Sequence, residues 1–199
     1  MAYPKEKFDL AADIALSLGF IALSDGDTVN FTALGKERTP TYSGARAISR
    51  AYKKIKSITP SGKHDLKREI GLSVSKTKAP GKCFFISDFL MPPEELIQAL
   101  EIPLAKNFEL GLINVLSPEE LDLSTLEDDA LLVDSETGSD LQLSVGKETK
   151  KAYARALAEH IDAIESFSKR SAAPYLLVSS ADSLREVVLN KFPKQGFIS

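Results

Sequence analysis

A run of apolar residues from 83 to 89 that ends in a single carboxylate, Asp88, constrains this fold more than any other segment. Uninterrupted hydrophobicity of this length is typical of a strand covered by helices on both faces of a parallel sheet. Pro93 then opens a new helix. The pattern predicts a buried strand that places Asp88 at the carboxyl edge of the sheet, where open α/β sheets bind ligands. In the alternative interpretation, Asp88 only caps the next helix or holds a turn.

The composition of the chain fits one globular domain over residues 1–199, since 43% of the residues are hydrophobic. Cys83 is the one cysteine, which excludes a disulfide framework and predicts a small core hydrophobe in a reducing compartment. The apolar stretch 14–23 follows Asp9 and Asp13, so it resembles neither a secretory signal nor a membrane span. We therefore expect a cytoplasmic protein.

The net charge of -3 hides a strong asymmetry along the chain. Residues 36–82 contain 13 Lys or Arg against 3 Asp or Glu, whereas residues 83–149 contain 2 against 15. This division predicts a molecule with one basic and one acidic side that can steer a charged partner. Two solvated faces that keep the protein soluble are the alternative.

Helical and strand patterns alternate along the chain. Strands are predicted at 28–34, 83–89, 108–116 and 175–179, and helices at 8–23, 46–58, 64–74, from Pro93 to near Pro103, 147–168 and 183–192. Residues 130–145 predict a β-hairpin appended to the sheet. This order predicts an α/β fold, a three-layer sandwich with a mostly parallel, Rossmann-like sheet.

The helix at 46–58 has a basic face and an apolar face. Its apolar positions are Ile48, Ala51, Tyr52, Ile55 and Ile58, and its basic positions are Arg46, Arg50, Lys53 and Lys54. The basic positions are candidates for binding a partner. A nucleic-acid binder that uses residues 46–56 is an alternative, although the sequence has no groove-reading motif and its pI is about 5.5.

Motifs for familiar enzyme chemistry are lacking in the sequence. Neither G-x-x-x-x-G-K-[ST] nor G-x-G-x-x-G occurs, which argues against ATP or dinucleotide use. His64 and His160 are far apart and without metal-ligand spacing, which predicts surface or helix-packing roles. The remaining enzyme hypothesis is a Mg²⁺-assisted hydrolase that uses Asp88 with an acidic-loop residue such as Glu119.

Four segments in order resemble a known family. They are Phe8-Asp9-Leu10-Ala11, Gly26-Asp27-Thr28-Val29-Asn30-Phe31, Phe85-Ile86-Ser87-Asp88-Phe89, and Val133-Asp134-Ser135-Glu136-Thr137-Gly138 with Tyr153 on the helix that follows. Together they resemble the carboxyl-terminal part of the bacterial family called domain of unknown function 58, a von Willebrand factor type A-like group.

The resemblance implies a non-enzymatic interaction domain with a metal-ion-dependent adhesion site, in a family associated with MoxR-type AAA ATPases. Such a site holds a divalent cation, here Mg²⁺, through a D-x-S-x-S loop, a threonine from a second loop and an aspartate from a third. On that pattern Asp88 matches the aspartate. Thr39, Thr41 or Ser43 lies where the second loop contributes, and the choice among the three stays open.

The sequence departs from this pattern because it contains no D-x-S-x-S, and the nearest fragment, at 122–125, is incomplete. The resemblance thus implies an incomplete metal site. Our hypothesis is that Met1 corresponds to an internal methionine of the family and that the chain is amino-terminally truncated, without its central first strand. The strands at 28–34 and 83–89 then either pair directly or accept a strand from another polypeptide.

These considerations predict a cytoplasmic, von Willebrand factor type A-like protein-interaction module, an adaptor for a MoxR-type AAA ATPase. One predicted binding surface is the carboxyl edge around Ser87, Asp88 and the loop 39–43. The basic face of the helix at 46–56 is the second predicted surface.

Overall fold

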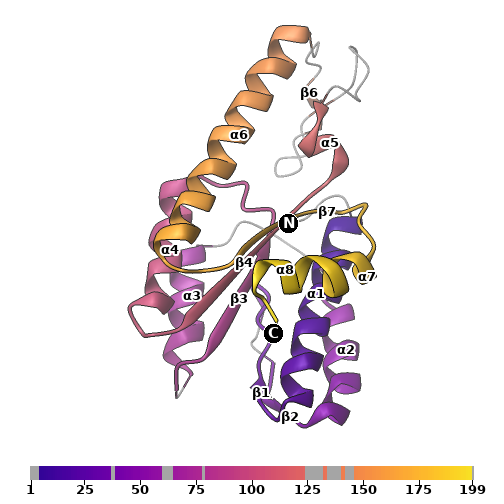
Figure 1. Ribbon diagram of the computed structural model, residues 1–199, viewed down its shortest axis with the longest axis vertical. Coiled ribbons are helices and arrows are strands. Elements are labelled where there is room, and N and C mark those ends of the chain that lie inside the picture. The colour runs from indigo at the N-terminus through magenta and orange to yellow at the C-terminus, as the bar shows by residue number, and fades with distance from the viewer. Residues whose placement is uncertain are drawn as a thin grey trace.

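A computed structural model describes residues 5–36, 39–59, 65–77, 79–123, 132–133, 140–141 and 146–198 of the protein. His64, Ser124, Thr125 and the hairpin turn at 134–138 lie outside these residues. Within them, helices alternate with strands along the chain, and the three longest strands form one sheet (Figure 1).

The central sheet consists of three parallel strands in the order β3-β4-β7. Strand β3 spans Lys82–Ser87, β4 spans Glu109–Leu116 and β7 spans Tyr175–Ser179. In register, Ile86 lies beside Ile113, and Ile113 lies beside Leu176. The strands predicted from apolar runs are therefore confirmed, and they run parallel as expected.

The three strands differ in burial. All residues from Leu110 to Leu116 in the middle strand β4 are buried, whereas the apolar residues of β3 are only half-buried. The prediction that β3 is fully covered was wrong in this respect. Among the described residues β3 pairs with β4 alone, so it is an edge strand and has a strand neighbour on one side only.

Helices cover both faces of the sheet. Helix α1 (Lys5–Ser24) packs over one face together with the short carboxyl-terminal helices, around a core that contains Ile14, Ile113 and Val178. Helices α4 (Pro93–Leu104) and α6 (Lys147–Arg170) pack over the other face, around Leu112 and Ile164. The three-layer α/β sandwich predicted from the order of elements is confirmed (Figure 1).

Two helices lie outside these layers. Helix α2 (Ile48–Lys56) packs on α1 through Ala51 and Ile55, which are buried. Helix α3 (Leu66–Ser75) packs on α4. Tyr52, predicted to face inward with the other apolar positions of α2, is instead 53% exposed, because it lies at the margin of the face that meets α1.

Two small hairpins complete the strand pairing. Strands β1 (Thr28–Val29) and β2 (Tyr42–Ser43) form an antiparallel pair, so the predicted strand at 28–34 is much shorter than expected. Strands β5 (Leu132–Val133) and β6 (Asp140–Leu141) are also antiparallel, which confirms the pairing that the predicted hairpin requires. Neither pair is hydrogen-bonded to the central sheet among the described residues, and β1 does not pair with β3.

The short helices connect or close the fold. They are a 3₁₀ turn at Ala45–Ala47, α5 at Pro118–Leu121, α7 at Leu184–Glu186, a π-helical segment at Val187–Lys191 and α8 at Phe192–Gln195. The single helix predicted over 183–192 is thus divided into three pieces. In the part of the chain that the structure describes, no helix combines the length and the apolar character needed to cross a bilayer.

Candidate functional site

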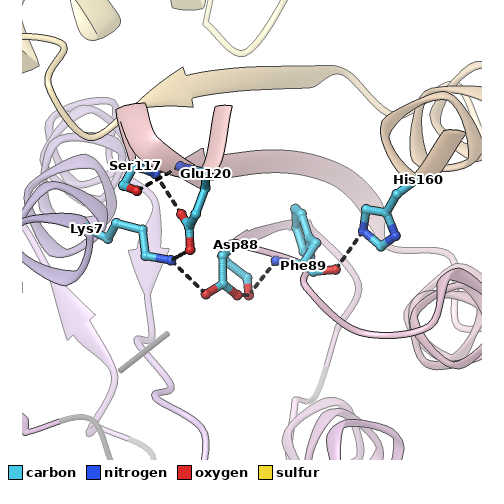
Figure 2. Close-up of polar contacts among 7 residues, drawn as sticks. Lys7, Asp88, Phe89, Ser117, Glu120 and His160 are labelled. Atoms are coloured by element: carbon cyan, nitrogen blue, oxygen red, sulfur yellow. Dashed lines mark hydrogen bonds and ion pairs between the residues drawn. The ribbon is translucent and has the colours of Figure 1, made fainter. Parts of the chain in front are cut away.

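Three charged side chains from distant parts of the chain meet at the carboxyl edge of the sheet (Figure 2). Lys7 comes from the first turn of α1, Asp88 directly follows β3, and Glu120 lies in α5, just after β4. The Lys7 Nζ atom donates to Glu120 Oε1 at 2.6 Å and to Asp88 Oδ2 at 3.3 Å. We call these three residues the edge triad.

Glu120 is held in place by the way α5 begins. Ser117 caps this helix: its Oγ accepts from the Glu120 amide at 3.2 Å, and the Ser117 amide donates to Glu120 Oε2 at 2.7 Å. This capping box satisfies two amides at the start of the helix. One carboxylate oxygen of Glu120 is therefore committed to the backbone, and the other is directed at Lys7.

Tyr153 of α6 also contacts this corner of the sheet. Its hydroxyl donates to the Glu120 backbone oxygen at 2.9 Å. Burial of the ring, and secondarily the negative charge of Glu120, raise the pKa of Tyr153 above its usual value. The phenol thus stays protonated at neutral pH, as a hydrogen-bond donor must be.

Asp88 lies in a tight turn between β3 and α4. Ser87 Oγ lies 3.3 Å from Asp88 Oδ1 and accepts from the Phe89 amide at 3.2 Å. Phe89 is buried and has a φ of 51°. The residue that caps α4 is Pro92, so the alternative in which Asp88 caps this helix was wrong.

Lys7 is almost completely buried, with 2% of its side chain exposed. A buried ammonium costs several kcal/mol in lost hydration unless it is paired and hydrogen-bonded. The two carboxylates provide that pairing and themselves are partly exposed, at 16% for Asp88 and 24% for Glu120. The edge triad as a whole carries one negative charge and connects α1, β3 and α5.

The residues predicted to complete a metal site are not gathered around Asp88. Ser43 lies in β2 opposite Thr28, just beyond the last turn of α1, whereas Asp88 is paired with the first turn of α1. A helix of 20 residues is about 30 Å long. Ser43 and Asp88 are therefore near opposite ends of α1.

The two threonines are engaged in the loop that follows β1. Thr39 is buried, and its hydroxyl accepts from the Phe31 amide at 2.9 Å and donates to the Phe31 carbonyl at 3.1 Å. The Thr41 hydroxyl accepts from Asn30 Nδ2 at 2.9 Å. Both hydroxyls thus stabilise their own loop.

The donor set at the carboxyl edge does not fit a divalent cation. Hard cations need six or more oxygen ligands at short distances, and the oxygens of Asp88 and Glu120 that converge here converge on an ammonium group. Among the described residues, no group of three or more His, Cys, Asp or Glu side chains is arranged to hold a metal ion.

The hydrolase hypothesis names Asp88 and Glu119, and the edge triad contains only the first of them. Glu119 is exposed, and its neighbour Glu120 is the residue that approaches Asp88 through Lys7. Burial raises the pKa of Cys83 to about 11, so this thiol is a poor nucleophile near neutral pH. His160 Nε2 is hydrogen-bonded to the Phe89 carbonyl oxygen, which is a structural contact.

The predicted basic surface is accessible. Arg46, Arg50, Lys53 and Lys54 are all exposed, on and just before α2. A groove of about 300 Å³ also lies between α1, α2 and the carboxyl-terminal helices, and none of these four cations lines it. Phe20 and Tyr52 line this groove, with 48% and 53% of each residue exposed. Ser87, the other predicted partner-binding residue, lies beside the edge triad.

A larger cleft lies elsewhere, at the amino end of the sheet. Its volume is about 570 Å³, and Ser168, Ala173 and Tyr175 contribute to its lining at the junction of α6 and β7. None of the predicted site residues lines it. Because the chemistry-bearing side chains are at the opposite end of the strands, we assign the cleft no role.

Sequence reasoning missed Lys7 and Glu120. The pattern Ser117-Pro118-Glu119-Glu120 is a capping-box signature and could have placed Glu120 at the start of a helix after β4. Nothing local to Lys7 indicates burial, since its partners are 81 and 113 residues away in the sequence.

Comparisons with known proteins identify a sequence family and a solved structure of similar fold. The sequence model of the family described as protein of unknown function DUF58 matches residues 2–163. No curated protein matches the chain. The chain is similar to the crystal structure of the conserved hypothetical protein BatB from Bacteroides thetaiotaomicron, with a TM-score of 0.50 and 14% sequence identity over 95% of this chain and 89% of that one. At this level of identity the likeness concerns the fold alone.

Proposed function

Because the chain belongs to the family described as protein of unknown function DUF58, we propose that it is a non-enzymatic protein-interaction domain that serves as an adaptor for a MoxR-type AAA ATPase. The observation that carries the proposal is the surface formed by α2 and its groove. We call this the α2 surface and define it by Arg50, Lys54, Phe20 and Tyr52.

The α2 surface combines exposed apolar rings with exposed cations. Large apolar side chains gathered on a soluble surface are typical of sites that bind another protein, and Phe20 and Tyr52 line the same groove. Aromatic residues supply much of the binding energy at such interfaces. Arg50 and Lys54 lie two residues before and two residues after Tyr52, so they are on another side of α2. They favour a partner that presents acidic residues and also reaches the groove.

The carboxyl edge is the less accessible of the two predicted surfaces. The carboxylates of Asp88 and Glu120 are engaged by Lys7, and breaking a buried ion pair to bind a partner costs several kcal/mol. The α2 surface has no such cost, because its two cations, Arg50 and Lys54, are already exposed to solvent. We therefore place the principal contact at α2.

The proposal is tested by measuring binding of the purified chain to the MoxR-type ATPase of the same organism by surface plasmon resonance. R50E/K54E reverses two charges of the α2 surface, and we expect its association rate to fall about tenfold at low salt. The rate for the unmodified chain should decrease as salt rises from about 50 to about 300 mM, and the variant should lose most of that dependence.

A matched control reverses two cations at the same spacing on α6. K151E/R155E changes the net charge by the same amount, at side chains that are 77% and 82% exposed. We expect it to associate at nearly the original rate. If the two double variants slow association equally, total charge and not the α2 surface is responsible, and absence of any binding removes the adaptor role.

The apolar part of the surface is tested separately. Y52A removes a groove-lining ring and should accelerate dissociation, because buried aromatic anchors mainly set the lifetime of a complex. L72A removes an exposed apolar side chain on α3, away from α2, and should leave dissociation unchanged.

The basic face also favours a second candidate, a nucleic-acid binder that uses residues 46–56. Cations along one helix can neutralise phosphates, which gives an affinity that falls steeply with salt. A fluorescence polarisation titration with a single-stranded and a duplex oligonucleotide separates the candidates. Tight binding of an oligonucleotide, lost in R50E/K54E but retained in Y52A, would favour nucleic acid over a protein partner.

The hydrolase alternative requires turnover that depends on a metal ion. Phosphoester hydrolysis in Mg²⁺ that disappears in D88A would support it. The proposal expects no such turnover.

Strand addition at β3 stays a prediction. Glu109 donates its amide to the Gly81 carbonyl, so the alternate amides of Phe84 and Ile86 point away from β4. Such an edge can accept an extended segment from another chain. Slower hydrogen exchange of these two amides on addition of the ATPase would demonstrate it, whereas unchanged exchange would restrict the contact to the α2 surface.

A further inference from the structure

The position of Lys7 is unusual for a lysine. It lies in the first turn of α1, where the helix dipole disfavours a positive charge by about 0.3–1 kcal/mol. Its side chain is nevertheless 2% exposed. Both the helix dipole and the loss of hydration therefore disfavour the ammonium at this position. Its two carboxylate partners offset these costs.

Those partners are oriented in advance. Glu120 is fixed by the capping box of α5, which leaves Oε1 directed at Lys7. Asp88 is fixed by the turn at Phe89 and by the contact with Ser87. Two carboxylates that converge at the carboxyl ends of neighbouring strands would repel each other without a cation between them.

We propose that the Lys7 ammonium is the resident cation of this edge and stands in place of a divalent metal ion. The resemblance implies a metal at Asp88, but the oxygens that would bind it already bind Lys7. The predicted second-loop ligands lie towards the other end of α1. The edge triad thus links α1, β3 and α5 without any metal.

This assignment has a direct consequence for metal binding. The unmodified chain should not bind Mg²⁺ or Mn²⁺ at this edge, because a divalent ion must first displace a buried and doubly paired ammonium. Removing the ammonium should leave two neighbouring carboxylates without the cation that they share. That state should be unstable, and it should be stabilised again by a cation added in solution.

The first test is a thermal melt of the full chain with and without millimolar MgCl₂ or MnCl₂, beside an isothermal titration. We expect no change in Tm and no binding heat for the unmodified chain. Binding that disappears in D88N would overturn the proposal, because it would show that a metal ion competes successfully for the same carboxylate.

The second test replaces the cation. K7M should lower Tm by about 10 °C, since removing one partner of a buried ion pair is strongly destabilising. K56M removes a lysine that pairs at 2.8 Å with Asp13, also on α1, in a more exposed setting. It should shift Tm by only about 1–2 °C.

Two further measurements distinguish the role of the Lys7 charge as a counter-ion from the packing of its side-chain stem. MnCl₂ should recover part of the Tm of K7M but leave K56M unchanged, and a K7M that is indifferent to Mn²⁺ contradicts the proposal. K7M/D88N/E120Q removes all three charges and should melt well above K7M, because the two carboxylates that shared the ammonium are both neutral amides in it. If the triple variant is no more stable than K7M, the lysine stem and not its charge supports the fold. Should K7M fail to fold, the triple variant and the metal titration of the unmodified chain still decide the question.

Discussion

His160 holds the backbone of Phe89 from across the sheet edge, with its Nε2 atom 2.9 Å from the Phe89 carbonyl oxygen (Figure 2). A carbonyl only accepts hydrogen bonds, so Nε2 carries the proton. Phe89 has a φ of 51°, in the left-handed region that costs a residue with a side chain about 1–2 kcal/mol. The buried ring and the bond from His160 together hold this turn, which directly follows Asp88.

The first prediction concerns this bond. H160A should lower the free energy of unfolding by about 1–2 kcal/mol, because the Phe89 carbonyl loses its donor in a partly buried place. H160Q should retain most of the stability, since the amide nitrogen of glutamine can take the position of Nε2. Urea denaturation of the three proteins measures the effect. Equal losses in both variants would show that the imidazole ring contributes by packing and not by the hydrogen bond.

A second, partly buried polar pair connects β4 to β7. Asn114 Nδ2 donates to the Tyr175 hydroxyl at 3.0 Å, and within the described part of the chain Asn114 Oδ1 has no partner. Y175F and N114L should each destabilise the protein, Y175F by about 1–3 kcal/mol, because it leaves the amide of Asn114 buried without an acceptor. The double variant should cost clearly less than the sum. A double-mutant cycle from urea melts gives this coupling, and strictly additive losses would argue that the pair does not interact.

The sequence predicted the elements whose signal is local. Strand β4 is buried and β7 alternates between half-buried and buried residues, and their apolar runs showed both their type and their place. Asp88 was placed correctly at the carboxyl edge because a parallel strand of that length leaves little choice for the residue that follows it. The prediction of a three-layer sandwich followed from the order of these elements.

Long-range features were not predictable in this way. Tyr52 fits the apolar period of α2, but α1 covers only the part of that face around Ala51 and Ile55. Thr39 and Ser43 were chosen by their order along the chain, whereas the path of α1 carries them away from Asp88. The burial of Lys7 depends on two carboxylates contributed by the turn after β3 and by α5, and no local pattern encodes such a meeting.

The thiol of Cys83 provides a prediction about pH. Burial raises its pKa from 9.0 to about 11. At pH 8 the folded chain should therefore react with iodoacetamide about 100-fold more slowly than a thiol with the usual pKa. Mass spectrometry of timed samples, with and without urea, measures both rates. Rapid labelling in the absence of urea would show that the thiol is not buried in solution.

The same shift affects stability at high pH. The unfolded thiol ionises at a lower pH than the folded one, so the stability it contributes is complete below pH 9 and is lost as the pH rises towards about 11. Tyr175, whose pKa burial raises from 10.0 to about 12, adds a similar loss at higher pH. C83A should remove the decline that begins near pH 9 and leave the later one. Urea midpoints from about pH 8 to about pH 11 distinguish C83A from the unmodified chain, and identical profiles would contradict the assignment.

Gly111 in β4 is required by the aromatic cluster that lies over it. A Cβ atom at this position would be 2.6 Å from Phe84 Cδ1 and 3.1 Å from Phe197 Cε1. Phe84 stacks on Phe197, and Phe197 stacks on Phe192, with ring centroids 6.1 and 5.3 Å apart. The rings therefore have little room to retreat, and G111A should cost about 1–3 kcal/mol through overpacking.

A matched glycine on α3 gives the control for that substitution. A Cβ atom at Gly71 would meet no atom within 4 Å, and alanine is the better helix former by about 1 kcal/mol, so G71A should stabilise the protein. Urea melts of both variants should move the midpoint in opposite directions. F84L/G111A should recover part of the loss, because the smaller side chain vacates the contacted volume. A G111A protein as stable as the unmodified chain would mean that the aromatic cluster shifts freely, and the packing of α8 against β3 and β4 would then be loose.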